Sequence, residues 1–312
     1  MIVTVSLNPS MDKTGKLERF EHGGVNHITD IIRDAAGHGI IAAKTIKELD
    51  RDDELVCTGF LGGINGERIR LILEGLGIKT DFVTIAGNTR TNLKVVESNG
   101  FISEFNEPGP AVNEFEIEAL KAKILGYAGP ETVFIFSGSI LPGCPTDIYL
   151  GLVNDVKAKG SKVVMDVDAD VLKAATDAHP DIIKPDKKQL EQYYGYEFSV
   201  AEEGMIDMAK RIVEEKGVGM VCVSRGALGA LFITADKCYR CSAPRIIPKS
   251  TVGAGAAMNA ALALGLQNGC TTEDTIKLAM AISVGACTTE GTKPPAKEVV
   301  DEFKEKIVLE EI

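Results

Sequence analysis

The amino-acid sequence predicts an α/β protein with a doubly wound, mostly parallel β-sheet flanked by helices. Short, nearly continuous apolar runs rich in Val and Ile recur along the chain, as in ETVFIFSG and SKVVMDVD, and strands of this composition are buried on both faces of a sheet. Longer segments of helical period separate these runs. Alternating strands and helices are typical of a parallel sheet, because a crossover helix returns the chain to the same edge.

The apolar runs mark the expected strands, and the segments between them mark the expected helices. The strands fall at residues 1–7, 54–62, 80–87, 131–138, 161–168, 181–186 and 219–226. The helices fall at about residues 38–50, 66–77, 113–126, 146–159, 187–194 and 201–216. Glycine closes or follows several of these helices, as in Leu76-Gly77 and Lys159-Gly160, and a glycine in that place indicates a helix end.

Two stretches interrupt this alternation and predict a small separate sheet. Residues 10–34 and 88–106 contain short strand-like runs, and Ser98-Asn99-Gly100 predicts a hairpin turn within the second stretch. We expect both stretches to form a β-sheet lid on a single domain that spans residues 1–312.

The pattern changes again in the C-terminal part of the chain. Residues 230–243 predict a hairpin with its turn at Ala235-Asp236-Lys237, because two strand-like runs flank a short polar segment. Two long helices are expected after it, at about residues 254–267 and 272–290.

Composition and charge exclude several classes of protein. The net charge is −11 and the pI is about 5.0, which would repel nucleic acid, and no dense Lys/Arg cluster offsets that charge. No apolar run reaches the roughly 18 residues of a membrane span, and the N-terminus lacks the pattern of a secretory signal. We therefore expect a cytoplasmic protein with neither nucleic acid nor a membrane as a partner.

Cysteine usage indicates reduced thiols. The seven cysteines are an odd number in a chain large enough to build its own core. Cys238 and Cys241 form an isolated C-x-x-C pair, and a structural zinc site needs four ligands. We expect neither a disulfide framework nor a zinc centre.

A glycine-rich segment near the C-terminus is a candidate anion site. Gly253, Ala254 and Gly255 stand at the start of a helix, where small residues let backbone N–H groups approach a phosphate and the helix dipole attracts it. Small residues also permit close helix packing, so this segment alone leaves both interpretations open.

Several motifs together resemble the ribokinase-like (PfkB) family of carbohydrate kinases, and in particular its 1-phosphofructokinase and tagatose-6-phosphate kinase branch. In chain order they are TVSLNPSMD, TGFLGGINGERIRLILEGLGIKTDF, TRTNLK, NEPGP, SGSILPG, KPD, SRGALG and the STVGAGAAM segment. The match extends over essentially the whole chain. The resemblance implies a ribokinase-like fold and a kinase that transfers the γ-phosphoryl group of ATP, with Mg²⁺, to a hexose phosphate such as fructose-1-phosphate or tagatose-6-phosphate.

The base position of that family is altered in this chain. An aspartate that ends the family's G-A-G-D loop accepts the proton of the sugar hydroxyl, and Ala256 stands in its place. An alanine methyl accepts no proton, and loss of a positioned base typically lowers a rate by roughly 10²–10⁴-fold. We therefore expect a degenerate active site and a weak or inactive kinase.

Other motif positions depart from the family as well. The family's glycine block G-G-[K/G]-G-I-N reads Ala36-Gly37-His38-Gly39-Ile40-Ile41, so Ile41 replaces an amide that would reach the sugar. The N-x-x-E pattern reads Asp186-Lys187-Lys188-Gln189, in which Gln189 is neutral while Asp186 could still orient a hydrated Mg²⁺. His27 stands where the lid of the family usually carries a cation.

The resemblance carries binding roles over to two groups of residues. Substrate binding is implied for Asp12, Gly37, His38, Gly39, Ile41, Arg90, Ser137 and Ser139. Nucleotide binding is implied for Lys184, Asp186, Gln189, Ser224, Gly226 and Gly229, with Gly253, Ala254 and Gly255 as the anion hole. Taken singly, Asp12 could cap a turn, Arg90 could form a surface ion pair and Lys184 could be a solvated strand end.

Alternatives remain open at this point. His38 could act as a replacement base, although a turn or pocket-lining role is favoured because the glycine block and residue 256 need not face the same hydroxyl. The chain could be a non-catalytic protein that binds nucleotide or sugar phosphate, or an active kinase with a different base and substrate. Gly37-His38-Gly39-Ile40-Ile41-Ala42 fits a dinucleotide-binding pattern, but it follows no clear strand and lacks the later acid, which excludes an oxidoreductase. The resemblance also implies a homodimer formed through the lid.

Overall fold

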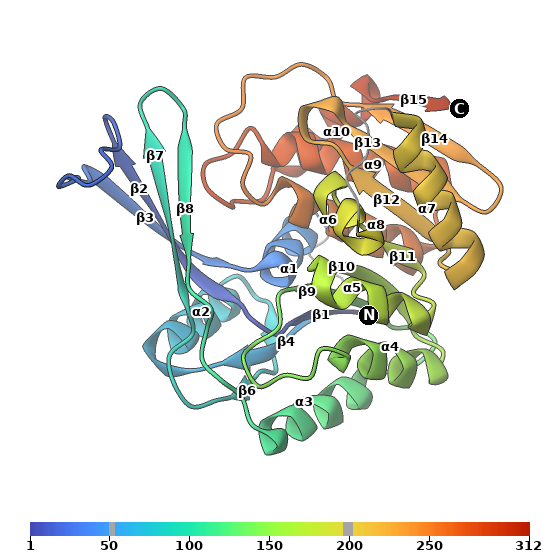
Figure 1. Ribbon diagram of the computed structural model, residues 1–312, viewed down its shortest axis with the longest axis horizontal. Coiled ribbons are helices and arrows are strands. Elements are labelled where there is room, and N and C mark those ends of the chain that lie inside the picture. Colours follow the sequence, from blue (N-terminus) through green and yellow to red (C-terminus); the bar gives the residue numbers. More distant parts are fainter. Residues whose placement is uncertain (50–53, 196–201) are drawn as a thin grey trace.

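A large, mostly parallel sheet forms the centre of the molecule (Figure 1). The computed structural model describes residues 1–49, 54–195 and 202–312. The strands of this sheet are β1 (Ile2–Ser6), β4 (Leu55–Leu61), β5 (Lys79–Thr80), β6 (Val83–Thr84), β9 (Val133–Gly138), β10 (Lys162–Val167), β11 (Ile182–Ile183), β12 (Met220–Ser224), β13 (Ala230–Thr234), β14 (Cys238–Ser242) and β15 (Val308–Glu311). Their order is β15-β14-β13-β12-β11-β10-β9-β1-β4-β5, with β6 beside β4, and β13 to β15 form an antiparallel edge.

Helices cover both faces of this sheet, as the apolar strand runs predicted. One face packs against α1 (His38–Leu49), α2 (Gly63–Gly75), α8 (Ala254–Asn268), α9 (Thr272–Ala286) and α10 (Lys297–Lys306). The other packs against α3 (Glu114–Tyr127), α4 (Ile148–Ala158), α5 (Ala169–Ala175), α6 (Lys187–Tyr194) and α7 (Glu202–Lys216). Short 3₁₀ turns lie at Thr176–Ala178 and Gly226–Leu228. The two apolar cores on either side of the sheet hold the strand ends in register.

A separate four-stranded sheet stands away from the main body, on the left in Figure 1. It consists of β2 (Ser10–Leu17), β3 (Asp30–Ala36), β7 (Thr91–Glu97) and β8 (Ile102–Asn106), in the order β3-β2-β7-β8. The β7–β8 hairpin turns at residues 98–100, where Gly100 has a φ of 89°. The predicted lid sheet is thus confirmed.

Some element boundaries differ from the sequence prediction. The strand expected at 80–87 is two short strands, β5 and β6, and the helix expected at 66–77 begins earlier, at Gly63. The helix expected to reach residue 290 ends at Ala286. The hydroxyls of Thr288 and Thr289 donate hydrogen bonds to the last helical carbonyls, which the backbone N–H groups of a further turn would otherwise bind. Helices α5 and α10 and strand β15 were not predicted. Residues 50 and 201, the ends of two predicted helices, lie outside the described residues.

The lid is fastened to the body by a buried charge at its root. Lys44 of α1 is 5% exposed, and its ammonium lies 2.8 Å from Asp34 and donates to the carbonyl of Ala35, both in β3. Thr292, which follows α9, donates to the same Asp34 carboxylate. This contact, the lid-root joint, connects the lid, α1 and the C-terminal region. None of the described helices is long and apolar enough to cross a membrane.

Candidate functional site

The candidate site lies at the carboxyl ends of the central parallel strands. Ser6 ends β1, and it is paired in register with Ser137 near the end of β9. Ser137 is paired in turn with Asp166 of β10. Parallel α/β sheets bind ligands at this edge because loops and helix N-termini converge there.

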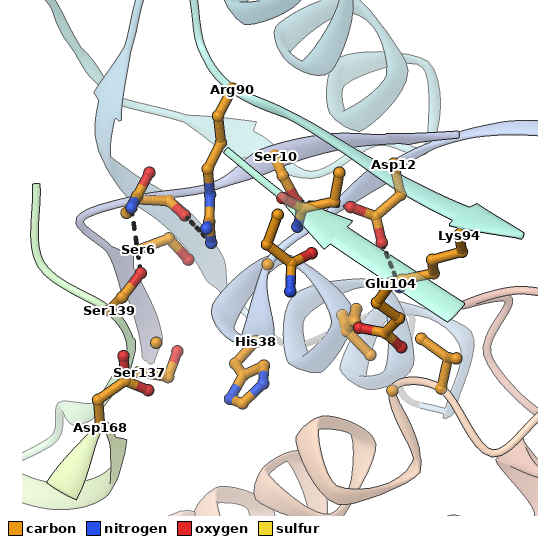
Figure 2. A pocket seen from close by; sticks show the side chains of 18 residues that line it. Ser6, Ser10, Asp12, His38, Arg90, Lys94, Glu104, Ser137, Ser139 and Asp168 are labelled. Atoms are coloured by element: carbon orange, nitrogen blue, oxygen red, sulfur yellow. Dashed lines mark hydrogen bonds and ion pairs between the residues drawn. The ribbon is translucent and has the colours of Figure 1, made fainter. Parts of the chain in front are cut away.

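A polar cavity of about 370 Å³ opens above these strand ends, between the lid and the body (Figure 2). The substrate residues expected from the sequence that line it are Asp12, Gly37, His38, Ile41, Arg90, Ser137 and Ser139. Figure 2 shows Asp12, Lys94 and Glu104 on the lid side and Ser137 and Asp168 on the opposite side. The cavity therefore brings together residues far apart in the sequence.

One end of the cavity is built to receive an anion. The guanidinium of Arg90 donates to the backbone carbonyls of Asn8 and Glu107, at 3.0 and 3.1 Å, which fixes its position. Asn8 also donates to Ser139 at 3.1 Å. Arg90 Nε is buried and has no hydrogen-bond partner among residues 1–49, 54–195 and 202–312. Burial lowers the pKa of Arg90, although Asp12, Asp168 and Glu107 oppose this shift. A guanidinium held in this way suits a phosphate.

The lid face above the cavity carries a buried ion pair. Asp12 is 4% exposed, accepts a hydrogen bond from Ser10 at 2.6 Å and lies 2.5 Å from the ammonium of Lys94. Asn92 donates to Ser10 at 3.1 Å. Asp12 is thus held by side-chain partners inside the cavity and does not cap a turn, which excludes that alternative reading of Asp12.

A cluster of buried charges lies below the cavity floor. Asp166 is 2% exposed and lies 3.1 Å from the ammonium of Lys184 and 3.0 Å from Nδ1 of His38, while Asn259 of α8 donates to it at 2.7 Å. Burial alone would raise the pKa of Asp166, but the positive charges of Lys184 and His38 lower it well below its ordinary range. Lys184 is therefore a buried ion-pair residue, and the solvated-strand-end reading is wrong.

Two hydroxyl groups at the strand ends are buried beside the cavity and lack hydrogen-bond partners among the described residues. The hydroxyl oxygens of Ser6 and Ser137 are buried, line the cavity and have no hydrogen-bond partner among the described residues. Gly39 lies beside them: a Cβ on this residue would come within 2.4 Å of Ser6 Oγ and 3.0 Å of Ser137 Oγ. A buried unpaired hydroxyl costs free energy, so a polar ligand in this cavity would satisfy both groups.

A second cavity, of about 490 Å³ and mostly apolar, lies on the other side of the α8 N-terminus. Ser224, Gly226 and Gly229 line it, together with Ala254 and Gly255 at the start of α8. Its other walls include Pro244, Met258, Met280 and Val284. An apolar slot beside a helix N-terminus suits an aromatic base with an attached phosphate chain.

The α8 N-terminus divides the two cavities. Gly253 lines the polar cavity, whereas Ala254 and Gly255 line the apolar one. Ala256, in the first turn of α8, is 2% exposed and packs into the core. Residue 256 thus follows directly on the segment that divides the cavities, but its methyl group is packed in the core and lines neither cavity.

Three other residues expected to bind nucleotide do not line the apolar cavity among the described residues: Lys184, Asp186 and Gln189. Asp186 caps α6: it accepts from the backbone N–H of Gln189 at 2.7 Å, and Gln189 accepts from the N–H of Asp186 at 2.9 Å. Gln189 also donates to the carbonyl of Val167 at 3.1 Å. The bond donated to Val167, which a glutamate could not make, accounts for an amide at position 189 in structural terms.

Several residues of the site were missed by sequence reasoning. They are Asn8, Asn92, Lys94, Asp166, Asp168 and Asn259. Asp166 and Asp168 did carry a signal, because acidic residues ending an apolar strand run point to the ligand-binding edge of a parallel sheet. Asn259 carried none, since an amide within an alanine-rich helix has no distinguishing pattern.

Comparisons with known proteins agree with one another. A model of the "pfkB family carbohydrate kinase" matches residues 5–298. The chain is 31% identical to a 1-phosphofructokinase of Vibrio cholerae over 98% of this chain and 95% of that protein, and 33% identical to a 1-phosphofructokinase of Borreliella burgdorferi over 90% of each. The structure of Phosphofructokinase-2 from Escherichia coli in complex with substrates and products superposes with a TM-score of 0.92 at 25% identity, covering 98% of both chains. The tetrameric inhibited form of the same enzyme gives a TM-score of 0.90 at 25% identity, again covering 98% of both chains.

Proposed function

Because the chain belongs to the PfkB family of carbohydrate kinases, we propose that it binds a phosphorylated hexose in the polar cavity and ATP in the apolar cavity, and transfers the γ-phosphoryl group slowly. The relatives from Vibrio cholerae and Borreliella burgdorferi are 1-phosphofructokinases, so fructose-1-phosphate is the first substrate to consider, with tagatose-6-phosphate as the second. The observation that carries this proposal is the meeting of the two cavities at the α8 N-terminus.

The polar cavity supports sugar-phosphate binding by its charges. Arg90 offers a fixed guanidinium to the phosphate already on the sugar, and Asp12 offers a carboxylate to sugar hydroxyls. The unpartnered hydroxyls of Ser6 and Ser137 add two further groups that a sugar would satisfy. Ile41 also lines the polar cavity, but its aliphatic side chain can make no hydrogen bond to a sugar.

Phosphoryl transfer would take place at the junction. Gly253 is the N-cap of α8 and Ala254 and Gly255 are its first residues, so in this proposal their backbone N–H groups would stabilise the negative charge that develops on the transferred phosphoryl group. Positioning and charge stabilisation supply most of the catalysis in phosphoryl transfer, so some turnover is expected without a base at Ala256. We propose that this substitution is the reason for a low rate.

Magnesium fits the nucleotide side through a single carboxylate. Asp186 is exposed at the start of α6, and one of its oxygens is free of the capping bond. Among the described residues no group of three or more His, Cys, Asp or Glu could hold a metal ion. Mg²⁺ in kinases is bound by one or two carboxylates, waters and substrate phosphates, and it neutralises charge on the phosphates when bound. Asp186 would orient it through water.

The second candidate is a non-catalytic protein that binds the same ligands. Ala256, Ile41 and Gln189 favour it, because each replaces a polar group of the family with one that cannot perform its role. This candidate predicts ligand binding without turnover.

A homodimer through the lid is also proposed. Phe105 of β8 and Ile31 of β3 are 49% and 43% exposed, and they lie on the lid face that points away from Lys94 and Glu104. Apolar side chains on an open sheet face favour association with a second copy.

The proposal is tested by measuring binding and turnover separately. Isothermal titration with ATP, in the presence of Mg²⁺, and with fructose-1-phosphate, tagatose-6-phosphate and an unphosphorylated hexose should give binding of ATP and of one hexose phosphate only. Coupled detection of ADP should then show turnover well below the about 1–100 s⁻¹ typical of kinases. Binding with no turnover would establish the second candidate, and binding of neither ligand would contradict both.

A further inference from the structure

We propose that His38, oriented by Asp166, accepts the proton of the sugar hydroxyl and so takes the place of the carboxylate that is missing at residue 256. This inference rests on the proposed kinase function. It assigns a catalytic role to His38 and a positioning role to Asp166.

The imidazole ring of His38 is oriented by a contact between its Nδ1 and Asp166. It is the first residue of α1, directly after Gly37, and its Nδ1 lies 3.0 Å from the carboxylate of Asp166. The side chain is 47% exposed and lines the polar cavity. Nε2, on the opposite edge, makes no hydrogen bond to any described residue. Figure 2 shows the ring in the cavity, with Ser137 and Asp168 nearby.

The position of Asp166 places this pair beside residue 256. Asp166 accepts a hydrogen bond from Asn259, which follows residue 256 by three positions on α8. Residues three apart share a helix face, so a side chain on residue 256 would project toward the same region as Asn259. A Cβ on Gly255 would in turn lie 3.5 Å from the ammonium of Lys184, the other partner of Asp166. The imidazole of His38 and a carboxylate on residue 256 would therefore both lie close to Asp166.

The charges around the imidazole favour a proton acceptor. Burial would lower the pKa of His38, but the charge of Asp166 and its hydrogen bond outweigh burial and raise it. Lys184, after β11, acts against this rise, and Asp168, before α5, adds to it. A histidine whose Nδ1–H is held by a carboxylate has a more basic Nε2 and an imidazolium that the carboxylate stabilises.

The reaction step balances without any further reactant. The sugar oxygen forms a bond to the γ-phosphorus of ATP, and the bond from that phosphorus to the β,γ-bridging oxygen breaks. ADP leaves with the electron pair. The hydroxyl proton passes to Nε2 of neutral His38, and the imidazolium next to Asp166 then releases it to solvent.

Asp168 is the competing acceptor in this cavity. It lies in the wall, and burial raises its pKa, although His38 opposes this effect. Unlike His38 it has no side-chain hydrogen bond that fixes its orientation among the described residues, since it makes no capping bond to α5. His38 is therefore the better oriented of the two groups.

The test compares His38→Asn with His179→Asn. Asparagine at 38 can still donate to Asp166 but has no basic ring nitrogen. His179 is exposed, lies before the amino end of β11 and has a φ of 51°, a left-handed conformation that asparagine tolerates. Circular dichroism and ligand titration first establish that each variant folds and binds ATP and fructose-1-phosphate.

We expect kcat to fall about 100-fold or more in His38→Asn, the loss typical of a removed base, and to stay unchanged in His179→Asn. In the unmodified chain kcat should rise with pH through a histidine pKa above its ordinary value of about 6.5, because only neutral His38 accepts a proton. His38→Asn should lack this rise, and added imidazole should restore part of the rate of His38→Ala.

A dependence on residue 256 provides the final check. In an Ala256→Asp background, His38→Asn should cost little, because the new carboxylate accepts the proton. Turnover with an unchanged pH profile in His38→Asn would overturn the inference but leave the kinase function standing. Loss of the pH dependence in Asp168→Asn but not in His38→Asn would assign the proton to Asp168 instead. Absence of turnover in the unmodified chain would overturn both.

Discussion

At the scale of single residues, the site combines buried polar side chains in the cavity wall with an alanine in the first turn of α8. Asp12 and Arg90 are fixed by buried partners, and both face the polar cavity. Ala256 is packed among apolar neighbours at the start of α8. The two features are independent, because the proposed binding groups Asp12 and Arg90 belong to the lid and to the loop before β7, whereas residue 256 belongs to a helix on the body. Binding can therefore persist when catalysis weakens.

Restoring a carboxylate at residue 256 should raise activity. Because His38 already accepts the proton in the proposed mechanism, we expect Ala256→Asp to increase kcat by less than the roughly 10²-fold effect of a first positioned base. The N-terminus of α8 and the nearby Lys184 would stabilise the negative charge. Initial rates of ADP formation measure the change.

Ala256→Asn is the matched control for that variant, since it has the same size and polarity but no basic oxygen. It should leave kcat near that of the unmodified chain. An equal gain in both variants would mean that polarity, not proton acceptance, limits the rate. No gain in either would mean that Ile41 and the other cavity substitutions also restrict the reaction.

Motif spacing identified the residues that line the cavity, but not the charges that organise them. Asp12, Arg90 and Ser139 stand in recognisable motifs, and the structure places them around one cavity. The contacts of Asp166 with His38, Lys184 and Asn259 join four separate segments. Only tertiary packing brings such partners together, so no local pattern could have predicted this cluster.

At the scale of elements, the first turn of α6 combines a capping box with a contact to the end of β10. Asp186 and Gln189 satisfy each other's backbone N–H groups, and Gln189 ties the helix to the carbonyl of Val167 in β10. A glutamate at 189 could complete the capping box but could not donate to Val167. The neutral amide thus stabilises the packing of α6 against the end of β10.

Removing the cap should separate these two roles. Asp186→Ala should lower the free energy of unfolding by about 1 kcal/mol, the usual value of a lost helix cap, and should also weaken the response of turnover to Mg²⁺. Asn113→Ala removes the corresponding cap of α3, another capping box, which lies away from both cavities. It should cost a similar free energy and leave the Mg²⁺ response unchanged.

Urea unfolding and Mg²⁺ titration of the initial rate provide the two readouts. If the Mg²⁺ response is the same in both variants, Asp186 is only a helix cap and the proposed water-mediated contact with the metal is wrong.

Long, strongly patterned elements were predicted better than short ones. Helix α6 was expected at residues 187–194 and forms there, because Asp186 and Gly195 mark its ends. Helix α5 has only seven residues, Ala169–Ala175, and its apolar side chains continue the strand run before it. Strand β15 is mostly exposed and forms by pairing with β14. No pattern in its own sequence predicts that pairing.

At the scale of the whole molecule, the lid has two different faces. Its inner face carries Asp12, Asn92 and Lys94 into the polar cavity. Its outer face carries Phe105 and Ile31, which are partly exposed, although Phe20 packs near the Phe105 ring at 6.1 Å between centroids. An apolar outer face on a sheet that stands away from the body favours a partner there.

Charge on this outer face should dissociate the proposed dimer. We expect Phe105→Glu to sediment as a monomer where the unmodified chain sediments as a dimer, because a carboxylate in an apolar interface is poorly solvated. Phe115→Glu is the control: Phe115 on α3 is 88% exposed and lies away from the lid. A dimer that survives Phe105→Glu would place the interface elsewhere.

The lid-root joint has a consequence for the order in which the molecule is made. Thr292 reaches Asp34 across 258 positions of sequence, and Lys44 is buried between them. Ribosomes release a chain from its N-terminus, so early segments fold before late ones exist. Until residue 292 has emerged, the ammonium of Lys44 and the carboxylate of Asp34 lack one of their enclosing partners. The lid-root joint is thus begun near the start of translation and completed only near its end, and a chain that ended before residue 292 would lack the contact between Thr292 and Asp34.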